Sequence, residues 1–198
     1  MGAYEQIITL AKQKGIILAK DIAMLDIPTT YISRLTERGE LQRIGRGIYM
    51  LPDHQVTENH SLAVVCAQVP SGVICLLSAL RFHHLTTQLP FQVWVALKKQ
   101  AWKPTIEDIS MRYFWFSGLS YTEGIETHQV EGISINVYHP AKTVADCFKF
   151  RNRIGVDVAV EALRDGLHRQ YFAVDELWHY AKICRVQSII TPYMEAIL

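Results

Sequence analysis

Apolar residues recur at helical spacing through the first third of the chain. The segment 4–14 shows this spacing and ends at Gly15, which predicts an amphipathic helix. Further helices are predicted over 19–25 and 28–38, and a two-stranded hairpin is predicted over 41–51. Three helices followed by a hairpin are typical of a winged helix-turn-helix domain, in which the third helix enters the major groove of DNA and the hairpin forms a wing.

The predicted helix over 28–38 turns two apolar side chains, Ile32 and Leu35, toward the core. Its other face is polar: small side chains there allow close approach to DNA, and an arginine can reach a guanine edge or a phosphate. In the hairpin, Gly45 and Gly47 supply a permissive backbone around a charged turn. The candidate DNA-contacting residues are Thr29, Thr30, Ser33, Arg34, Arg43 and Arg46.

After a polar connector over 53–59, the pattern becomes a mixture of strands and helices. Strands are predicted over 72–76, 92–97, 110–116, 127–131 and 134–138. Helices are predicted over 61–69, 78–84, 140–149, 156–167, 174–184 and 189–197. The predicted fold class is therefore α+β, with a winged helix-turn-helix domain over 1–52 and a mixed α/β domain over 60–198 whose C-terminal part is helical.

The charge of the chain favours DNA binding only weakly. The 198 residues carry 20 Lys and Arg against 19 Asp and Glu, but residues 1–52 carry seven against five. Because the electrostatic part of DNA affinity grows with the number of phosphates neutralised, a homodimer on DNA would double a small contribution. Winged helices also serve as protein-interaction modules, so direct binding of a protein partner by this domain stays open as an alternative.

The cysteine pattern and the apolar segments indicate a soluble cytoplasmic protein. The four cysteines, at positions 66, 75, 147 and 184, show no metal-binding spacing, and buried thiols in a reducing compartment are expected. The N-terminus lacks the pattern of a signal peptide, and Pro70 and Gly72 interrupt the most apolar stretch, 62–80. We therefore expect no membrane segment.

No recognisable catalytic constellation is present, so we expect no enzymatic activity, no metal and no cofactor. His83 and His84 are adjacent, so on a helix they point about 100° apart and cannot chelate one metal ion together. A metal-dependent nuclease is a weaker alternative, because the strand VWVALKK carries lysines but no acidic residue.

Two groups of charged residues mark the segment 139–153. His139, Lys142 and Asp146 share one face of the predicted helix, where a local ion pair is expected. Lys149, Arg151 and Arg153 form a basic cluster. Two interpretations of this cluster stay open. It is an accessory surface for DNA backbone contact or for antitoxicity, or its cations are simply those that a helix C-terminus favours.

Three stretches resemble AbiEi-type antitoxins, the repressor half of abortive-infection toxin-antitoxin pairs in bacteria. They are YISRLTERGELQRIGRGIYMLP at 31–52, SALRFHHLTTQLPFQVWVAL at 78–97 and HPAKTVADCFKFRNRIGVDVAVEALRDGL at 139–167. The first is similar to the family's winged helix, and the other two to its following domain. The third is the most specific, since arginine-bearing wings occur in many regulators.

The resemblance implies a two-domain transcriptional repressor that binds double-stranded DNA at inverted repeats in its own promoter. It also implies a C-terminal domain needed for antitoxicity and cooperative repression, and a nucleotidyltransferase toxin that is antagonised without a stable complex. The family's DNA contacts fall on Arg34, Arg43 and Arg46, and less directly on Thr29, Thr30 and Ser33.

Overall fold

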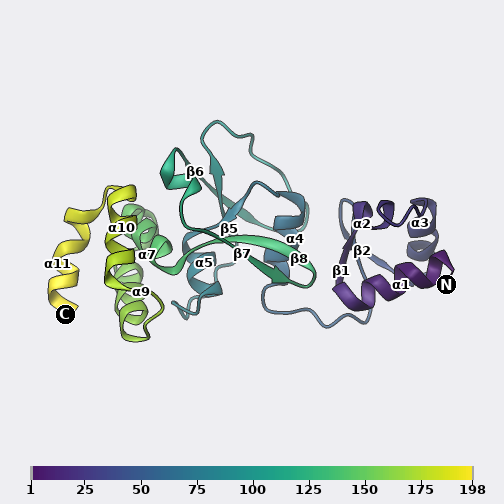
Figure 1. Ribbon diagram of the computed structural model, residues 1–198, viewed down its shortest axis with the longest axis horizontal. Helices are drawn as coiled ribbons and strands as arrows, with labels where there is room; N and C mark the ends of the chain where they lie inside the picture. Colours follow the sequence, from purple (N-terminus) through teal and green to yellow (C-terminus); the bar gives the residue numbers. More distant parts are fainter. Residues whose placement is uncertain (1, 198) are drawn as a thin grey trace. The chain divides into compact units, whose positions relative to one another are not determined.

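The computed structural model describes residues 2–197 and divides the chain into two compact units (Figure 1). The first unit comprises Met1–Ser71 with two later segments, Pro104–Ile109 and His128–Ile135. The second comprises Gly72–Lys103, Ser110–Thr127 and Asn136–Leu198. Each unit has its own hydrophobic core.

The N-terminal segment has the element order of a winged helix-turn-helix domain, as predicted. The elements are α1 (Ala3–Lys14), β1 (Ile16–Leu18), α2 (Ala19–Ala23), α3 (Thr30–Glu37), β2 (Gln42–Gly45) and β3 (Ile48–Met50). The strands form an antiparallel sheet in the order β1-β3-β2. The sequence pattern did not reveal β1, and α3 begins two residues later than predicted, because Pro28 lies in the preceding turn, where its carbonyl accepts a bond from Tyr31.

Buried aliphatic side chains from all three helices form the core of this segment. Ile7 of α1, Ile22 of α2 and Leu35 of α3 are fully buried in one cluster. The helices end where the backbone turns: Gly15 closes α1 at φ 85° and Gly39 follows α3 at φ 72°. Positive φ costs glycine little, so both helix ends are local consequences of the sequence.

A five-stranded mixed sheet is the centre of the rest of the chain, with the strand order β6-β5-β4-β8-β7. The strands are β4 (Val73–Ile74), β5 (Val93–Lys98), β6 (Met111–Phe116), β7 (Ile125–Val130) and β8 (Ile133–Tyr138). The strand β5 pairs parallel with β6 and antiparallel with β4, and β4 pairs parallel with β8. Every predicted strand is present, so the α+β fold class is confirmed.

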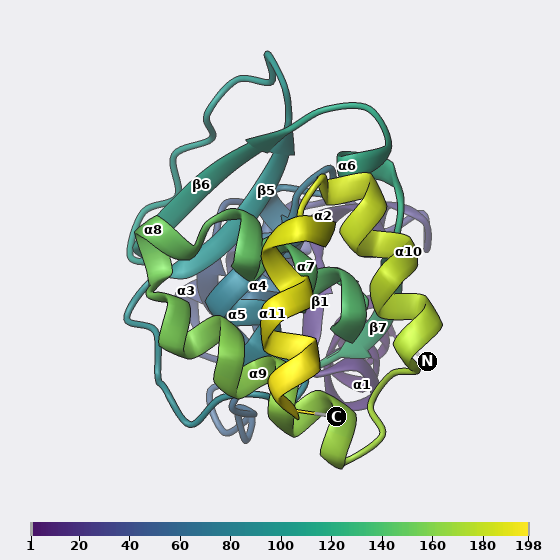
Figure 2. The same cartoon turned by 90° about the vertical axis from the view of Figure 1, so that its left-hand side faces the viewer.

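The helical C-terminal part is also confirmed, and Figure 2 shows its longer helices gathered together. The helices after the winged domain are α4 (His60–Gln68), α5 (Leu76–Phe82), α6 (Leu119–Thr122), α7 (Pro140–Lys149), α8 (Arg151–Ile154), α9 (Val156–His168), α10 (Val174–Cys184) and α11 (Gln187–Ile197). The sequence pattern missed α6 and α8, which span four residues each and are too short to show a period. Among the described residues, no helix has the length and apolarity needed to cross a bilayer.

The ion pair expected on α7 exists, but it lies inside the core. Lys142 and Asp146 are both 0% exposed, and the Lys142 ammonium donates to Asp146 Oδ2. Cys184 Sγ donates to the other carboxylate oxygen over 3.2 Å. His139 does not join them: its ring caps α7 through Ala141 N, and its Nε2 lies 3.6 Å from Glu176. All four cysteines are buried thiols, as predicted.

Glu131, in the turn between β7 and β8, joins this turn to the segment that follows the wing. Its side chain is 2% exposed and accepts hydrogen bonds from Thr57 N at 2.8 Å, Thr57 Oγ1 at 2.7 Å and His60 Nδ1 at 2.7 Å. Its backbone carbonyl accepts from Ile16 N. Burial raises the pKa of Glu131, but the bonds from His60 and Thr57 together lower it below its ordinary value.

Candidate nucleic-acid interface

The candidate base-reading surface is the outer face of α3. Ile32 and Leu35 are 2% and 0% exposed, and they fix this helix against the core. Since residues three and four apart share a helix face, the polar positions between them point outward. The four predicted contact residues of this region, Thr29, Thr30, Ser33 and Arg34, are all exposed.

Aromatic rings contact Arg34 of α3 and Arg38, which directly follows this helix. The Arg34 guanidinium lies 6.0 Å from the centroid of the Tyr31 ring, and that of Arg38 lies 5.1 Å from the Tyr4 ring. The two tyrosine rings contact each other edge to face, 4.9 Å apart. A hydrogen bond with Tyr4 raises the pKa of Arg34, whose side chain is exposed. These contacts restrict the rotamers of the guanidinium before any ligand arrives.

The wing presents its charge at a two-residue turn, Arg46-Gly47, between β2 and β3. Gly47 has φ 71°, a conformation that favours glycine. Gly45 has no such need, contrary to the expectation that both glycines serve the turn. A Cβ on Gly45 would lie 2.9 Å from Gln68 Nε2, the end of a flexible side chain that would have to move aside. Arg43 and Arg46 are both exposed, and Arg43 Nε donates to the Gly45 carbonyl over 3.1 Å.

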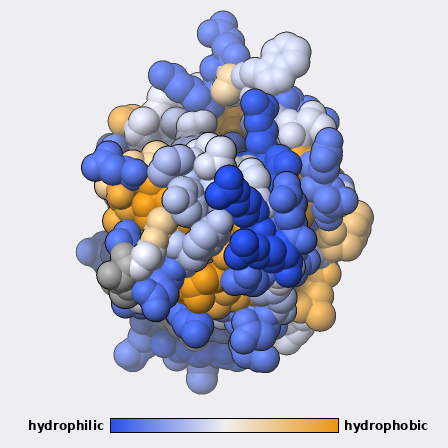
Figure 3. Space-filling view, turned by 90° about the vertical axis from the view of Figure 1, so that its right-hand side faces the viewer, coloured by the Kyte–Doolittle hydropathy of each residue, from blue (hydrophilic) through white to orange (hydrophobic). Residues whose placement is uncertain are grey.

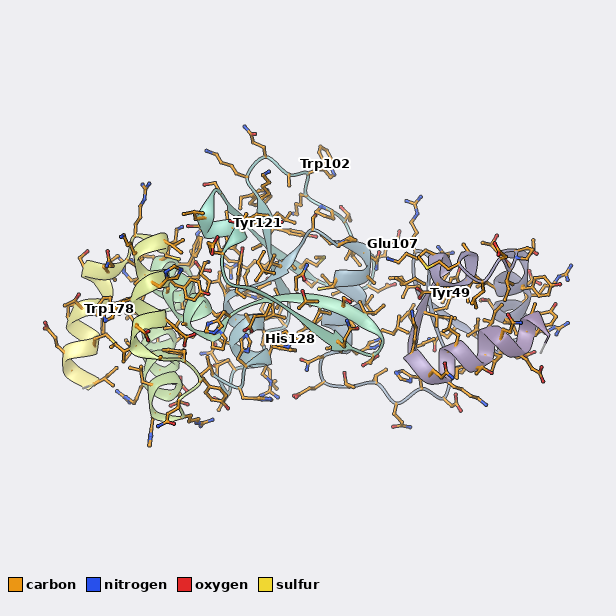
Figure 4. All side chains as sticks on the ribbon, viewed as in Figure 1. Tyr49, Trp102, Glu107, Tyr121, His128 and Trp178 are labelled. Atoms are coloured by element: carbon orange, nitrogen blue, oxygen red, sulfur yellow. The ribbon has the colours of Figure 1, made fainter. Side chains whose placement is uncertain are left out.

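Acidic residues that no local sequence pattern marked lie beside the wing. An open cleft of about 720 Å³ is lined by Arg43 and Arg46 of the wing together with Gln68, Glu107 and Asp108. Figure 4 labels Glu107, and also Tyr49 on β3 of the wing. More than fifty residues separate the wing from these carboxylates in the chain, so no local pattern indicated the meeting. The carboxylates reduce the positive potential that the wing offers to a phosphate.

Hydrophilic side chains dominate the face of the first unit that Figure 3 turns toward the viewer, where α1 and α3 lie in Figure 1. Small hydrophobic patches interrupt this surface. Protein–DNA interfaces are more polar and more positively charged than protein–protein interfaces.

The three residues of the basic cluster at 149–153 do not all lie at the same site. Lys149 and Arg151 line a second cleft, of about 880 Å³, together with Lys182 and Arg185. Arg153 does not line it and instead lies 5.9 Å from the centroid of the Phe150 ring. No local pattern marked Lys182 and Arg185, because they follow the cluster by about thirty residues and join it only through the packing of α10 on α7.

Metal-binding chemistry has no visible site in the described part of the chain. No three His, Cys, Asp or Glu side chains in residues 2–197 are grouped as a metal ion would require. His83 Nε2 makes a 2.7 Å hydrogen bond with the Tyr138 carbonyl, which is a packing role.

The three-stranded sheet, the exposed outer face of α3 and the arginine-bearing wing define the class: a winged helix-turn-helix of the kind found in transcriptional regulators. Residues 5–52 match the family model described as "Transcriptional regulator, AbiEi antitoxin". This match assigns the N-terminal domain to the AbiEi antitoxin regulators and confirms the resemblance over that segment. The family is a class of transcriptional regulators and not of enzymes. No curated protein matches the chain.

Proposed function

We propose that the protein is a cytoplasmic DNA-binding repressor and antitoxin that controls its own promoter. It counters a nucleotidyltransferase toxin without forming a stable complex with it, and it acts without catalytic activity. The DNA-binding domain comprises residues 1–52, and a connector over 53–59 leads to an antitoxin domain over 60–198.

The observation that carries this proposal is the division of α3 into two faces. Two buried side chains, Ile32 and Leu35, fix the helix, while every predicted DNA-contacting residue on it is exposed. In the major groove, Arg34 pairs with a guanine edge and the small side chains contact neighbouring base edges and phosphates. Arg43 and Arg46 of the wing bind the phosphate backbone, which sets position and orientation on the duplex.

A gel-shift titration on the DNA upstream of the gene tests the proposal. Arg34→Ala should weaken specific binding by about 1–3 kcal/mol, which is roughly 5- to 150-fold, and should relax the sequence preference at one position. Arg46→Ala should weaken binding to all sequences alike. Lys12→Ala, which removes an exposed cation from α1, is the matched control and should leave binding unchanged. If the double variant Arg34→Ala/Arg46→Ala binds as the wild type does, the residue assignment is wrong.

The rival function is a winged helix that holds a protein partner instead of DNA. Copurification with the product of the neighbouring gene separates the two. The proposal expects no stoichiometric complex and expects that DNA incubated with the protein and Mg²⁺ stays intact. A stable complex that masks α3, or cleavage of the DNA, would overturn it.

A further inference from the structure

The second cleft gathers positive charge from parts of the chain that are far apart in sequence. It is an open cavity of about 880 Å³, lined by Lys149 at the end of α7, Arg151 at the start of α8, Lys182 in the last turn of α10 and Arg185 directly after it. No aspartate or glutamate lines it. Four cations around one concave surface create a local field that attracts an anion.

Helix dipoles alone do not account for this arrangement. A cation near a helix C-terminus is favourable, and this explains Lys149 and Lys182 individually. The dipole effect does not explain why the ends of α7 and α10 and the start of α8 bring their cations to one cavity. The two C-termini contribute about −0.5 charge each, so most of the positive charge of the four side chains is uncompensated.

The cations keep their charges available to a ligand. None of the four forms an ion pair with a carboxylate among residues 2–197. Arg151 Nη1 donates to the Phe148 carbonyl over 2.9 Å, which fixes its guanidinium and leaves further donors free. Lys149 Nζ lies 5.6 Å from the Phe116 ring centroid. Lys182 and Arg185 are exposed.

The remaining lining adds hydroxyl groups and an apolar surface. Ser117 and Ser120 come from the segment at α6, which Ser120 Oγ ties to the Ile183 carbonyl over 3.3 Å. Figure 2 shows α6 next to the upper part of α10. Leu119 is 61% exposed at the cleft, a position where it can cover a flat apolar ring. Charge, the Ser117 hydroxyl and an apolar surface in one concave site are what a small anionic ligand with a ring requires.

We propose that this cleft binds a phosphate-bearing small molecule of nucleotide size, with its phosphates on the four cations and its ring against Leu119. The volume lies within the range of about 300–1,000 Å³ that is usual for small-molecule sites. A nucleic-acid duplex is the poorer fit, because proteins contact its backbone mainly through protruding elements such as helices and wings. The proposal does not depend on DNA binding by the first unit.

Isothermal titration calorimetry of the full chain with ATP, GTP, pyrophosphate and adenosine tests the proposal. Both nucleotides should bind with Kd below about 100 μM, pyrophosphate more weakly because it lacks the ring, and adenosine not measurably. The double variant Lys182→Gln/Arg185→Asn should weaken nucleotide binding at least about tenfold; asparagine suits position 185 because the wild-type φ there is 58°.

Lys98→Gln/Lys99→Gln removes the same charge from two exposed lysines outside the cleft and should leave the Kd within about twofold of the wild type. Arg34→Ala/Arg46→Ala should also bind nucleotide normally, which separates this proposal from the DNA-binding one. Circular dichroism and Tm verify that each variant is folded. The proposal is wrong if no nucleotide binds at millimolar concentration. It is also wrong if Lys98→Gln/Lys99→Gln weakens nucleotide binding as much as Lys182→Gln/Arg185→Asn does, or if duplex DNA of any sequence competes with the nucleotide for the same residues.

Discussion

Replacing Asp146 with Asn should strongly destabilise the protein, because the change leaves the Lys142 ammonium in the core without a counter-charge. Both side chains are 0% exposed, so water cannot replace the lost partner. The Tyr138 ring, 4.2 Å from Lys142 Nζ, is already part of the wild-type site and adds nothing new in the variant. The segment that carries this pair, HPAKTVADCFKF, is also the part most specific to the resemblance beyond the winged helix.

The size of the loss has two independent bounds. Removing one partner of a buried ion pair costs about 3–5 kcal/mol in proteins generally. The orphaned ammonium can instead lose its proton, and for an ordinary lysine at pH 7 that costs about 4.6 kcal/mol. The hydrogen bond from Cys184 can persist to the amide oxygen of the new side chain. We therefore expect a loss of about 3–5 kcal/mol, a large part of a typical total of about 5–15 kcal/mol.

Urea denaturation of the full chain, followed by circular dichroism, measures the effect as a shift of the unfolding midpoint. Glu161→Gln on the exposed face of α9 removes the same charge and should change stability by less than about 0.5 kcal/mol. Lys142→Met/Asp146→Leu should recover most of the loss, since an apolar pair of similar volume replaces the buried ions. A loss under about 1 kcal/mol for Asp146→Asn, or a double variant no more stable than the single one, would show that the buried ammonium does not need its counter-charge.

Three further predictions follow from the first unit. Because the folded pKa of Glu131 lies below its ordinary value of 4.5, its contribution to stability is complete above that pH and is lost as pH falls; Glu131→Gln should flatten this acid-side decline in Tm. Glu107→Gln/Asp108→Asn removes two carboxylates from the cleft of the wing and should tighten DNA binding in a gel shift, most clearly at low salt; unchanged affinity at 50 mM salt would show that they do not oppose DNA. Gly132→Ala places a Cβ 2.6 Å from a backbone carbonyl of α1, whereas Gly39→Ala meets nothing within 4 Å at a similar φ, so Tm should fall further for the first.

Local patterns were sufficient for the elements that the sequence itself stabilises. The two-faced helix α3 was predicted from Ile32 and Leu35, and the wing from a glycine turn that needs φ 71° at Gly47. The three residues of β1 were not predictable in this way. They are a strand only because β3 supplies partners for Ile16 and Leu18, and such pairing is a tertiary property.

The burial of charged side chains was also not predictable from the sequence pattern. A helical period predicts which side chains share a face, but α7 is buried from Pro140 to Phe148, so both faces lie in the core. Lys142 and Asp146 tolerate this only because each satisfies the other, which no hydrophobic pattern can encode. The basic cleft was also not predictable, because Lys182 of α10 and Arg185 directly after it reach Lys149 through packing alone.

The salt dependence of DNA binding should reveal how many copies of the winged helix occupy an operator. If Arg43 and Arg46 each neutralise one phosphate, the slope of log K against log salt is about −1.8 for one protomer and about −3.6 for two. Between 50 and 200 mM salt, affinity then falls about 12-fold for one protomer and about 150-fold for two. Because the chain carries a formal charge of only +1, little nonspecific attraction should obscure the difference. Arg46→Gln should make the slope shallower by about 0.9 or by about 1.8, respectively, whereas a slope that Arg46→Gln leaves unchanged would place the wing away from the phosphate backbone.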